Sequence, residues 1–459
     1  MKRARLTALL LALMFSLGAC GGDETLEQTS EETGGTETTE SPVSFPVDAA
    51  VPLALVDLNG YETGGEKTVL FRSDAIGETF ELRSVTDDSV VYTGAVRATG
   101  GGMSYGRFTE FQTGGTYYVF NETIGTSYAF RIGADIYAEL LSGSLSQFYS
   151  AAREAEESGS GDTTVLCDAL RDLLLAYEMY PARFADGGDT AAGENDIPEV
   201  LEEARRAVEW LLQMQDAGGA FHAGDLSGEE DSNVGLTLRE TTPESTICAA
   251  GVLARFAFVY GAHDTVYAEE VLSRAEQAWD SYTAVRTPLQ DPAAFAAAAE
   301  LYRITGDRRY EMVLAGFFPR EDFGTLLAEN TEILYGSATY LETQQPVNPE
   351  VCNAIRTHMT ADAAEIAEGA QQADYLVRAQ DADKVLSDAL RLCVMNHFIF
   401  RQERVGVMEN HLHYLCGRNP EATDYITESS ENSWKRTGAE PLFASLPHTA
   451  RLVLLLAAL

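Results

Sequence analysis

Between about residue 43 and residue 133, short apolar runs alternate with glycine-containing segments. The clearest runs are Thr68–Phe71, Phe80–Leu82, Val90–Tyr92, Phe108–Phe111, Tyr117–Phe120 and Ser127–Ile132. Runs of this length that are rich in aromatic and β-branched residues are typical of strands, and the Gly-Gly pairs at 64–65 and 114–115 predict hairpin turns. This part of the chain is therefore expected to form a β-sandwich.

After Tyr137 the spacing of the apolar residues becomes that of helices and stays so to the end of the sequence. The clearest helix is predicted from Asp196 to Gln215, with Asp196 as its N-cap, Pro198 in the first turn and Glu199 completing a capping box. Its apolar stripe consists of Ile197, Val200, Leu201, Ala204, Val208, Leu211 and Leu212. A Gly-Gly pair at 218–219 ends it.

Two more helices have clear boundaries. One is predicted to begin at Thr242-Pro243 and to end at Gly261, and the other to begin at Asp291-Pro292 and to end at Gly306. About 320 helical residues suffice for roughly twelve helices with short connections.

Strands at the spacing seen in residues 43–133, about ninety residues in all, are typical of an immunoglobulin-like sandwich. The sequence thus predicts a multidomain chain: an immunoglobulin-like β-sandwich (43–133) and an all-α domain (134–459).

The first twenty residues have the pattern of an export signal. Lys2, Arg3 and Arg5 precede an apolar stretch from Leu6 to Leu17, which is too short to span a bilayer stably. The stretch ends in Leu-Gly-Ala-Cys at 17–20, which resembles the lipobox of bacterial lipoproteins and implies lipidation of Cys20. The alternative is an ordinary signal peptide (1–20) with a chance cysteine.

Residues 21–42 are dominated by Glu, Thr, Gly and Ser and contain no basic residue. Such a segment buries too little apolar surface to fold, so it is expected to be a disordered acidic tether. Together with the lipidated Cys20, it predicts an extracytoplasmic protein anchored in the cell membrane through lipid. The C-terminal apolar run from Leu452 to Leu459 is too short for a membrane span.

The net charge of the chain disfavours some classes of binding partner. Lys and Arg number 32 against 71 Asp and Glu, which gives a formal net charge of −39. This charge argues against nucleic acid as a partner and against docking on anionic lipid through protein charge. Five cysteines remain beside Cys20, an odd number without the spacing of metal ligands: Cys167, Cys248, Cys352, Cys393 and Cys416. Mostly buried thiols are expected, rather than a disulfide framework.

Several segments, taken in order, resemble glycoside hydrolase family 9, the cellulase or endoglucanase family. They are residues 194–205 and 209–215 (ENDIPEVLEEAR and EWLLQMQ), 218–222 (GGAFH), 242–246 (TPEST), 278–280 (AWD), 300–307 (ELYRITGD) and 413–420 (HYLCGRNP). Residues 115–118 and 127–132 also resemble the immunoglobulin-like domain that precedes many such enzymes. His222 stands where the family has the histidine of Gly-Gly-x-Tyr-His, which makes it a candidate for substrate binding.

The resemblance implies that residues 134–459 form an (α/α)6 barrel with a glucan-binding cleft at one end. The implied reaction is inverting hydrolysis of β-1,4-glucan, in which one carboxylate activates a water molecule and a carboxylic acid protonates the leaving oxygen. The implied partner is a polysaccharide or oligosaccharide, and no cofactor is required.

The catalytic base of the family lies in an Asp-Ala-Gly-Asp sequence before a helix that here reads Leu-Leu-Leu-Ala-Tyr-Glu at 173–178. Counting back without gaps places Ser158 where the second aspartate is expected, and the Asp-Ala-Gly-Asp sequence is absent. Asp162 is the best substitute for the base. The alternative interpretation is that Asp162 is the N-cap of a helix starting at Thr163.

The family's catalytic acid is equally displaced. When the last helix of this chain is aligned with the last helix of the family, Phe443 stands where the family has its catalytic glutamate. Glu440 lies three residues earlier. Glu440 is the candidate acid if a small insertion is allowed; the alternative is a solvated loop glutamate. The family's His-x-Arg sequence has no histidine here, although Arg436 is retained as a candidate contact to sugar hydroxyls.

Sugar rings stack on exposed aromatic faces, which makes tryptophans candidate residues of a sugar-binding cleft. There are three of them. Trp210 and Trp279 lie in apolar helical sequence and are expected in the core, whereas Trp434 lies in a polar segment and is a candidate for sugar binding.

Two groups of residues resemble metal sites. Asp186, Asp189, Glu194 and Asp196 form an acidic loop that has the oxygen ligands for Ca²⁺, with a solvated loop as the favoured alternative. His397, His411 and His413 are interpreted as structural, because His411 and His413 would face different sides of a helix.

Two functional hypotheses follow. The first is an active extracytoplasmic glycoside hydrolase of the family 9 type whose chemistry survives on Asp162 and Glu440. The second is a non-catalytic descendant that keeps the barrel and binds glycan, since both catalytic sequences are eroded. A purely structural surface protein is a third possibility, but it explains none of the cleft-like features.

Overall fold

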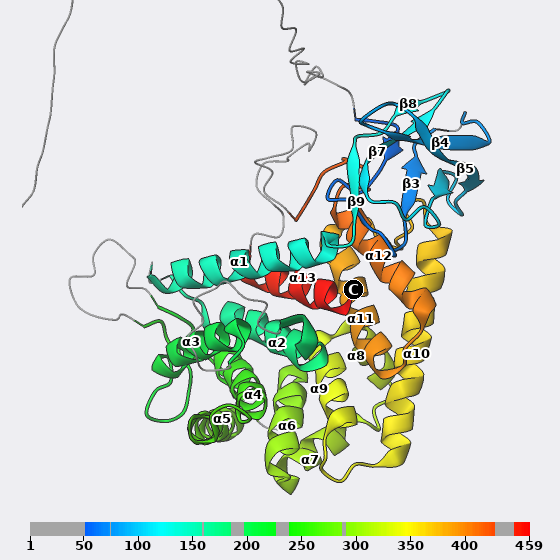
Figure 1. Cartoon of the computed structure of the whole chain (residues 1–459). Coiled ribbons are helices and arrows are strands. Elements are labelled where there is room, and N and C mark those ends of the chain that lie inside the picture. The colour runs from blue at the N-terminus through cyan, green and yellow to red at the C-terminus, as the bar shows by residue number, and fades with distance from the viewer. Residues whose placement is uncertain are drawn as a thin grey trace, which may run out of the picture. The chain divides into compact units, whose positions relative to one another are not determined.

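The computed structural model describes residues 51–73, 75–157, 160–184, 197–225, 238–286, 291–426 and 445–459 (Figure 1). Strands occupy the first part of the described chain, and helices follow from residue 136 onward. None of the helices in these ranges combines the length and the apolar character needed to cross a membrane.

The N-terminal part contains nine strands. They are β1 (Ala54–Leu55), β2 (Tyr61–Glu62), β3 (Thr68–Phe71), β4 (Thr79–Ser84), β5 (Val90–Ala98), β6 (Ser104–Arg107), β7 (Gly115–Asn121), β8 (Gly125–Thr126) and β9 (Phe130–Gly133). They pair in the order β1-β3-β6-β5-β4-β7-β9-β2, with β8 beside β7. All pairs are antiparallel except β2 and β9, which run parallel, with Tyr61 opposite Ile132.

The prediction of hairpin turns at the two Gly-Gly pairs was wrong. Residues 64–65 lie between β2 and β3, and residues 114–115 lie at the start of β7, which follows β6 in the chain. Neither β2 and β3 nor β6 and β7 are hydrogen-bonded to each other. These connections pass between distant positions in the strand order. Consecutive strands do pair at β4–β5, where the register shifts between Leu82 and Arg83, and at β5–β6 and β7–β8.

Strand β3 is buried on both faces, which explains why all four of its residues are apolar or small. Val69 and Phe71 pack into the core between the strands together with Phe80 and Phe108. Leu70 points the other way and packs with Ala422 of the helical part. A strand normally exposes one face of an antiparallel sheet, so β3 is the element through which the two parts share apolar surface.

The helical part contains thirteen α-helices within the described residues. They are α1 (Ile136–Glu157), α2 (Thr163–Met179), α3 (Glu199–Gln213), α4 (Pro243–Tyr260), α5 (Thr265–Val285), α6 (Pro292–Thr305), α7 (Arg308–Phe317), α8 (Phe323–Glu329), α9 (Thr331–Glu342), α10 (Pro349–Gln372), α11 (Ala382–Phe398), α12 (Gln402–Leu415) and α13 (Leu446–Ala458).

Local sequence signals explain many of the helix boundaries. The predicted limits of α4 and α6 are confirmed: Thr242 caps α4 through its side chain, Gly261 follows its last residue, and Gly306 closes α6 in the left-handed conformation. The predicted start of α3 was too early. The helix begins at Glu199 with Pro198 as its N-cap and without a capping side chain.

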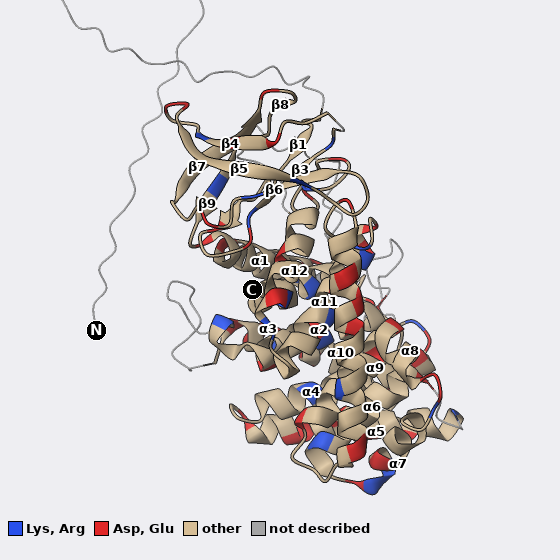
Figure 2. Ribbon diagram, turned by 90° about the vertical axis from the view of Figure 1, so that its right-hand side faces the viewer, with Lys and Arg blue, Asp and Glu red and all other residues tan. Residues whose placement is uncertain are grey.

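The helices are arranged in two layers. Helix α4 packs against α2, α5 and α6; α13 packs against α1, α2 and α11; and α6 packs against α4, α7 and α9. Consequently α9, α6, α4, α2, α13 and α11 form a continuous inner series, and Figure 1 shows α13 in red between α1 and α2. Figure 2 shows the acidic residues in red and the basic residues in blue along the ribbon. The acidic residues predominate, in agreement with 71 acidic and 32 basic residues in the sequence.

A buried ion network ties three inner helices together. Arg255 of α4 donates to Glu178 of α2 at 2.7 Å and to Glu300 of α6 at 2.5 Å. Arg303 also contacts both of these glutamates. Burial acts to raise the pKa of Glu300, but the charges of Arg255 and Arg303 outweigh it, so the pKa lies below its ordinary value. The network therefore holds Glu300 ionised in the core.

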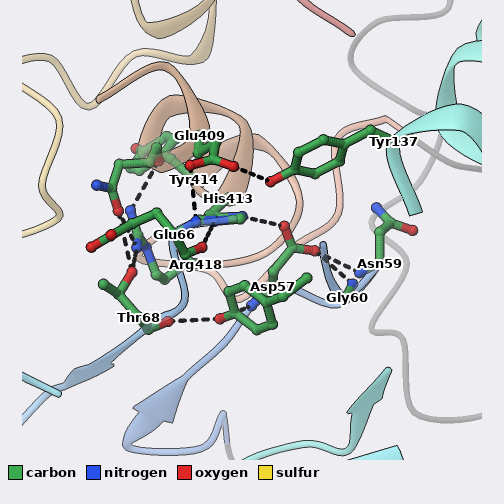
Figure 3. A network of polar contacts seen from close by, with 12 residues as sticks. Asp57, Asn59, Gly60, Glu66, Thr68, Tyr137, Glu409, His413, Tyr414 and Arg418 are labelled. Atoms are coloured by element: carbon green, nitrogen blue, oxygen red, sulfur yellow. Dashed lines mark hydrogen bonds and ion pairs between the residues drawn. The ribbon is translucent and has the colours of Figure 1, made fainter. Parts of the chain in front are cut away.

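A second polar network joins the strands to α12 and the segment after it (Figure 3). Nδ1 of His413 lies 2.7 Å from Oδ2 of Asp57, and Nε2 of His413 lies 2.8 Å from the carbonyl oxygen of Glu66. The other oxygen of Asp57 accepts the backbone N–H groups of Asn59 and Gly60. Both nitrogens of His413 thus lie within hydrogen-bonding distance of oxygen atoms from the strand part.

Neighbouring groups extend this network. One oxygen of Glu409 accepts the backbone N–H of Glu66 at 2.9 Å, and the other accepts the hydroxyl of Tyr137 at 3.3 Å. The guanidinium of Arg418, which is fully buried, donates to Asn410 and contacts the hydroxyl of Thr68. These bonds fix the end of α12 and the start of the segment that follows it.

Candidate active site

Residues from the N-terminal turns of five inner helices, α2, α4, α6, α9 and α13, lie together at one end of the helical part. Asp168 in the second turn of α2 contacts Arg171, which also contacts Glu332 in the first turn of α9. Cys248 of α4 contacts Asp168, and Arg451 of α13 contacts Asp172 of α2. Ala293, in the first turn of α6, lines the same cavity as Arg171 and Glu332. The end of the helical part at which these inner helices have their N-termini is called the N-terminal end.

Asp162 lies at the rim of this end, where it caps α2. Its Oδ1 accepts the backbone N–H groups of Thr164 and Val165 at 3.0 and 3.1 Å, and also the hydroxyl of Thr164 at 2.7 Å. Its Oδ2 accepts Nη1 of Arg239 at 3.0 Å. Both oxygens therefore have partners, and the N-cap interpretation describes the geometry of this residue.

The electrostatic surroundings keep Asp162 ionised. Partial burial acts to raise the pKa of Asp162, but the hydrogen bonds from Thr164 and Val165 and the charge of Arg239 outweigh it, so the pKa lies below its ordinary value. About a third of the side chain, 35%, remains exposed. A carboxylate of this kind can orient a water molecule through Oδ2, but it has a weaker driving force for proton abstraction than an unpaired one.

His222 belongs to the same rim. Its Nδ1 lies 2.5 Å from the carbonyl oxygen of Arg239, and its own carbonyl oxygen accepts the hydroxyl of Thr163 at 2.6 Å. Short bridges place residues 222–225 beside 238–241 and bring Gly224 opposite Asp162. The sequence-derived candidates Asp162 and His222 are thus brought together, with Arg239 between them.

The deeper group around Arg171 was not found from the sequence. Nη1 of Arg171 lies 3.1 Å from Oδ1 of Asp168 and 3.3 Å from Oε1 of Glu332. Burial is the largest effect on Asp168 and raises its pKa above the ordinary value, and the charge of Arg171 offsets only part of it. The available signal was the occurrence of three charged residues, Asp168, Arg171 and Asp172, within otherwise apolar helical sequence.

Two hollows lie at this end. A cavity of about 50 Å³ is lined by residues of α2, α4, α6 and α9, among them Cys167, Arg171, Cys248 and Glu332. A larger pocket of about 280 Å³ lies beside Asp162 and is lined among others by Arg153, Arg206 and Trp210. The smaller cavity has room only for water, whereas the larger one adjoins the rim carboxylate.

Four of the sequence-derived site residues lie outside the described residues: Cys20, Trp434, Arg436 and Glu440. The same holds for the acidic loop of Asp186, Asp189, Glu194 and Asp196. Their predictions stand without a structural test.

The expectation for the other two tryptophans is confirmed, since Trp210 and Trp279 are 6% and 3% exposed. The predicted structural role of the histidines also agrees with the structure. His411 and His413 are fully buried on α12, where His411 bonds the carbonyl oxygen of Val407 and His413 bonds Asp57. His397 is separate from both and pairs with Glu342.

The family model described as Glycosyl hydrolase family 9 matches residues 163–447, which is more than half of the chain. The chain belongs to glycoside hydrolase family 9. Among curated proteins, Endoglucanase C of Cellulomonas fimi is 26% identical over 391 residues, covering 64% of this chain and 35% of that protein. This family 9 chain thus spans about a third of the length of that relative.

Solved structures agree on the fold of this family 9 protein. A metagenome-derived glycoside hydrolase family 9 endoglucanase has a TM-score of 0.73 at 20% identity, covering 88% of this chain and 98% of that one. A single mutant of a thermostable endoglucanase from Alicyclobacillus acidocaldarius has a TM-score of 0.72 at 19% identity, covering 88% and 99%. A family 9 protein from Bacteroides ovatus has a TM-score of 0.71 at 14% identity, covering 88% and 98%. The coverage includes both the strands and the helices of this chain.

Proposed function

We propose that this family 9 protein binds β-1,4-linked glucan at the N-terminal end of the helical part and hydrolyses its glycosidic bond with inversion. The observation that carries this proposal is the position of Asp162. It is an ionised, partly exposed carboxylate that directly precedes the residues matched by the family model, 163–447, and it lies beside a pocket of about 280 Å³. The name of the curated relative, Endoglucanase C, supports the substrate class.

In the proposed reaction Oδ2 of Asp162 orients a water molecule for attack on the anomeric carbon and receives its proton. Glu440 donates a proton to the leaving oxygen, and inversion requires room for the water between the two carboxyl groups. Arg239 would release part of its contact with Oδ2 when the water binds, because that oxygen carries its bond at 3.0 Å. Arg436, Trp434 and His222 are proposed to contact the sugar.

The alternative is glycan binding without hydrolysis, and one observation favours it. Three donors from the first turn of α2 and one from Arg239 already occupy the oxygens of Asp162. A carboxylate with these partners completes the start of a helix and needs no substrate to explain it. In that case the protein keeps the glycan-binding end of its fold and has lost the base.

Further features belong to this proposal. The strands are proposed to form an immunoglobulin-like domain and the helices an (α/α)6 barrel, in agreement with the continuous inner series of six helices. The protein is proposed to be an extracytoplasmic lipoprotein anchored through Cys20, which the N-terminal sequence supports.

The test is the release of reducing ends from soluble β-1,4-glucan and from mixed-linkage glucan. Asp162→Asn keeps the cap acceptor and removes the charge, so a loss of turnover by about 10²- to 10⁴-fold without unfolding would support Asp162 as the base. Glu440→Gln should cause a similar loss. Asp264→Asn is the matched control, because Asp264 caps α5 in the same way and lies outside the proposed site.

The assay also separates the two candidate functions. Turnover that survives Asp162→Asn would contradict the assignment of the base. No turnover in any of the proteins, combined with retarded migration in gels that contain the glucan, would establish binding without hydrolysis. No turnover and no retardation would reject both candidates.

A further inference from the structure

The pocket of about 280 Å³ beside Asp162 lies on the outer side of the inner helices. Its lining comes from the last turns of α1, one side of α3 and the first residues of α2 and α13. Helix α1 packs against α13, and α3 packs against α2 and α4, so both cover the inner series from outside. Asp162, which caps α2, therefore stands between the N-terminal end of the inner helices and this pocket.

Apolar groups form one wall of the pocket. Trp210 of α3 lines it together with Leu166 and Ala207. Gly161 lies directly on the indole ring, because a Cβ atom at this position would come within 2.4 Å of Cζ2 of Trp210. A wall of this kind can pack against the C–H groups of a sugar ring.

The polar part of the pocket is a carboxylate between two guanidinium groups. Oε1 of Glu203 pairs with Nη2 of Arg153, and Oε2 of Glu203 lies 3.9 Å from Nη1 of Arg206. A guanidinium carries five N–H donors. Nε and Nη1 of Arg153 make no hydrogen bond with the described residues, and this side chain is half exposed. These donors can therefore bond the hydroxyl groups of a ligand.

Charge and size limit what the pocket can hold. Among the described residues of its lining, the arginines 153 and 206 stand against the carboxylates of Asp162 and Glu203, so the positive and negative charges balance. This balance favours a neutral ligand over an anionic sugar. Pockets for small molecules typically measure about 300 to 1,000 Å³, so a volume of about 280 Å³ suits one sugar ring and not a length of chain.

We propose that this pocket holds a single-sugar branch of a substituted β-1,4-glucan, while the backbone of that glucan lies across the N-terminal end. The inference rests on the proposed function, because it takes the backbone to bind beside Asp162. A branch leaves the backbone sideways, as the pocket leaves the inner helices toward α1 and α3. Arg153, Glu203 and Arg206 contact the hydroxyl groups of the branch. The substrate class is thus a glucan with neutral branches.

The test compares two oligosaccharides by isothermal titration of the full chain in the cold. One is the heptasaccharide unit of xyloglucan, a cellotetraose backbone that carries single xylose branches, and the other is cellotetraose itself. Because the backbone is the same, a difference in affinity reports on the branches. The heptasaccharide should bind at least about tenfold more tightly, as expected for a few additional hydrogen bonds.

Two variants locate this difference in the pocket. Ala155→Phe places a ring in it, because Ala155 belongs to the lining, and should lower the affinity for the heptasaccharide to that for cellotetraose. Glu203→Gln should weaken binding of the heptasaccharide by about threefold to tenfold, because bonds to the branch lose a charged partner. Glu209→Gln is the matched control, since Glu209 pairs with Arg205 on the same helix at 3.0 Å and lies outside the lining.

Equal affinity of the unmodified protein for the two oligosaccharides would overturn the inference and leave glucan binding itself intact. A preference that both variants retain would overturn it as well. So would an equal loss for both oligosaccharides in Ala155→Phe, because the pocket would then hold a ring of the backbone. Binding of neither oligosaccharide would reject the proposed function together with this inference. Glu203→Gln, which preserves the shape of the side chain, decides the matter where Ala155→Phe fails to fold.

Discussion

His413 Nδ1 and Asp57 Oδ2 lie 2.7 Å apart, although 356 positions separate these residues in the chain and both are fully buried. The contact joins α12 to the segment before β2, and burial is the largest effect on Asp57, raising its pKa above the ordinary value. The pair therefore belongs to the interface between the strands and the helices and not to the rim around Asp162.

Asp57→Asn should destabilise the protein strongly. Asparagine keeps an acceptor for the backbone N–H groups of Asn59 and Gly60, but His413 loses its charged partner. Breaking a buried pair typically costs about 3 to 5 kcal/mol. Urea unfolding should show a loss of this size, whereas Arg286→Gln, which breaks an exposed pair with Glu244, should cost about 1 kcal/mol or less. Equal effects of the two variants would contradict the role of Asp57.

The effect of Glu409→Gln should depend on pH. Burial is the largest effect on Glu409 and raises its pKa above the ordinary value of 4.5. A raised pKa favours the protonated form in the folded protein, so this stabilisation is complete below pH 4.5 and is lost as pH rises through the folded pKa. Glutamine remains neutral, with its oxygen toward Glu66 N–H and its NH₂ toward the Tyr137 hydroxyl.

The free energy of unfolding of Glu409→Gln, relative to the unmodified sequence, should therefore increase between pH 4.5 and pH 8. Denaturation by urea at several pH values measures this difference. Glu403→Gln, on the exposed first turn of the same helix, is the control and should show no such trend. A difference that stays constant with pH for Glu409→Gln would refute the prediction.

Gly224→Ala should disturb the rim around Asp162. Gly224 has φ +155°, and a Cβ atom on it would overlap the carbonyl oxygen of Gly161, which is backbone and cannot rotate away. The overlap would push residue 224 away from Asp162, with a loss of about 1 to 3 kcal/mol in the free energy of unfolding.

Glucan binding by Gly224→Ala should fall together with its stability. Gly143→Ala is the control, because the space around that glycine is open and alanine favours the helix. If Gly224→Ala bound glucan as well as the control does, the rim would not be part of the binding site.

Asp162 should also contribute to stability through its cap. Asp162→Ala should lower the free energy of unfolding by about 1 kcal/mol, whereas Asp162→Asn should retain most of it because asparagine caps well. The pKa of Asp162 lies below its ordinary value of 3.8, so its contribution is present above that pH and is lost as the pH falls through the folded pKa. Thermal unfolding of the three proteins at pH 7 and pH 3 compares them.

The sequence patterns predicted the structural features that depend on residues close together in the chain. The limits of α4 and α6 follow from Thr242, Gly261 and Gly306, because caps act within one turn. The same reasoning allowed Asp162 as a cap. The hairpins at the Gly-Gly pairs failed, since glycine indicates that the chain turns but not which strands then pair.

These patterns did not predict the contacts between segments that lie far apart in the sequence. Arg171 and Glu332 are 161 positions apart, and nothing local in either helix identifies the partner. The same is true of Asp57 and His413, which lie in separate parts of the fold. Only the family resemblance carries information at that range, and it was weakest where the catalytic residues are expected.

The burial of β3 on both faces has a consequence for folding while the chain is being synthesised. Thr68 contacts Arg418, which follows it by 350 positions, and Leu70 packs with Ala422. A chain that emerges from the ribosome N-terminus first can close the core between its strands, but the outer side of β3 stays uncovered until residues 418–422 have been made. An apolar face left uncovered for that time can associate with apolar surfaces of other nascent chains, so we expect the young polypeptide to need a chaperone over this face of β3 until the residues around Arg418 and Ala422 have been made.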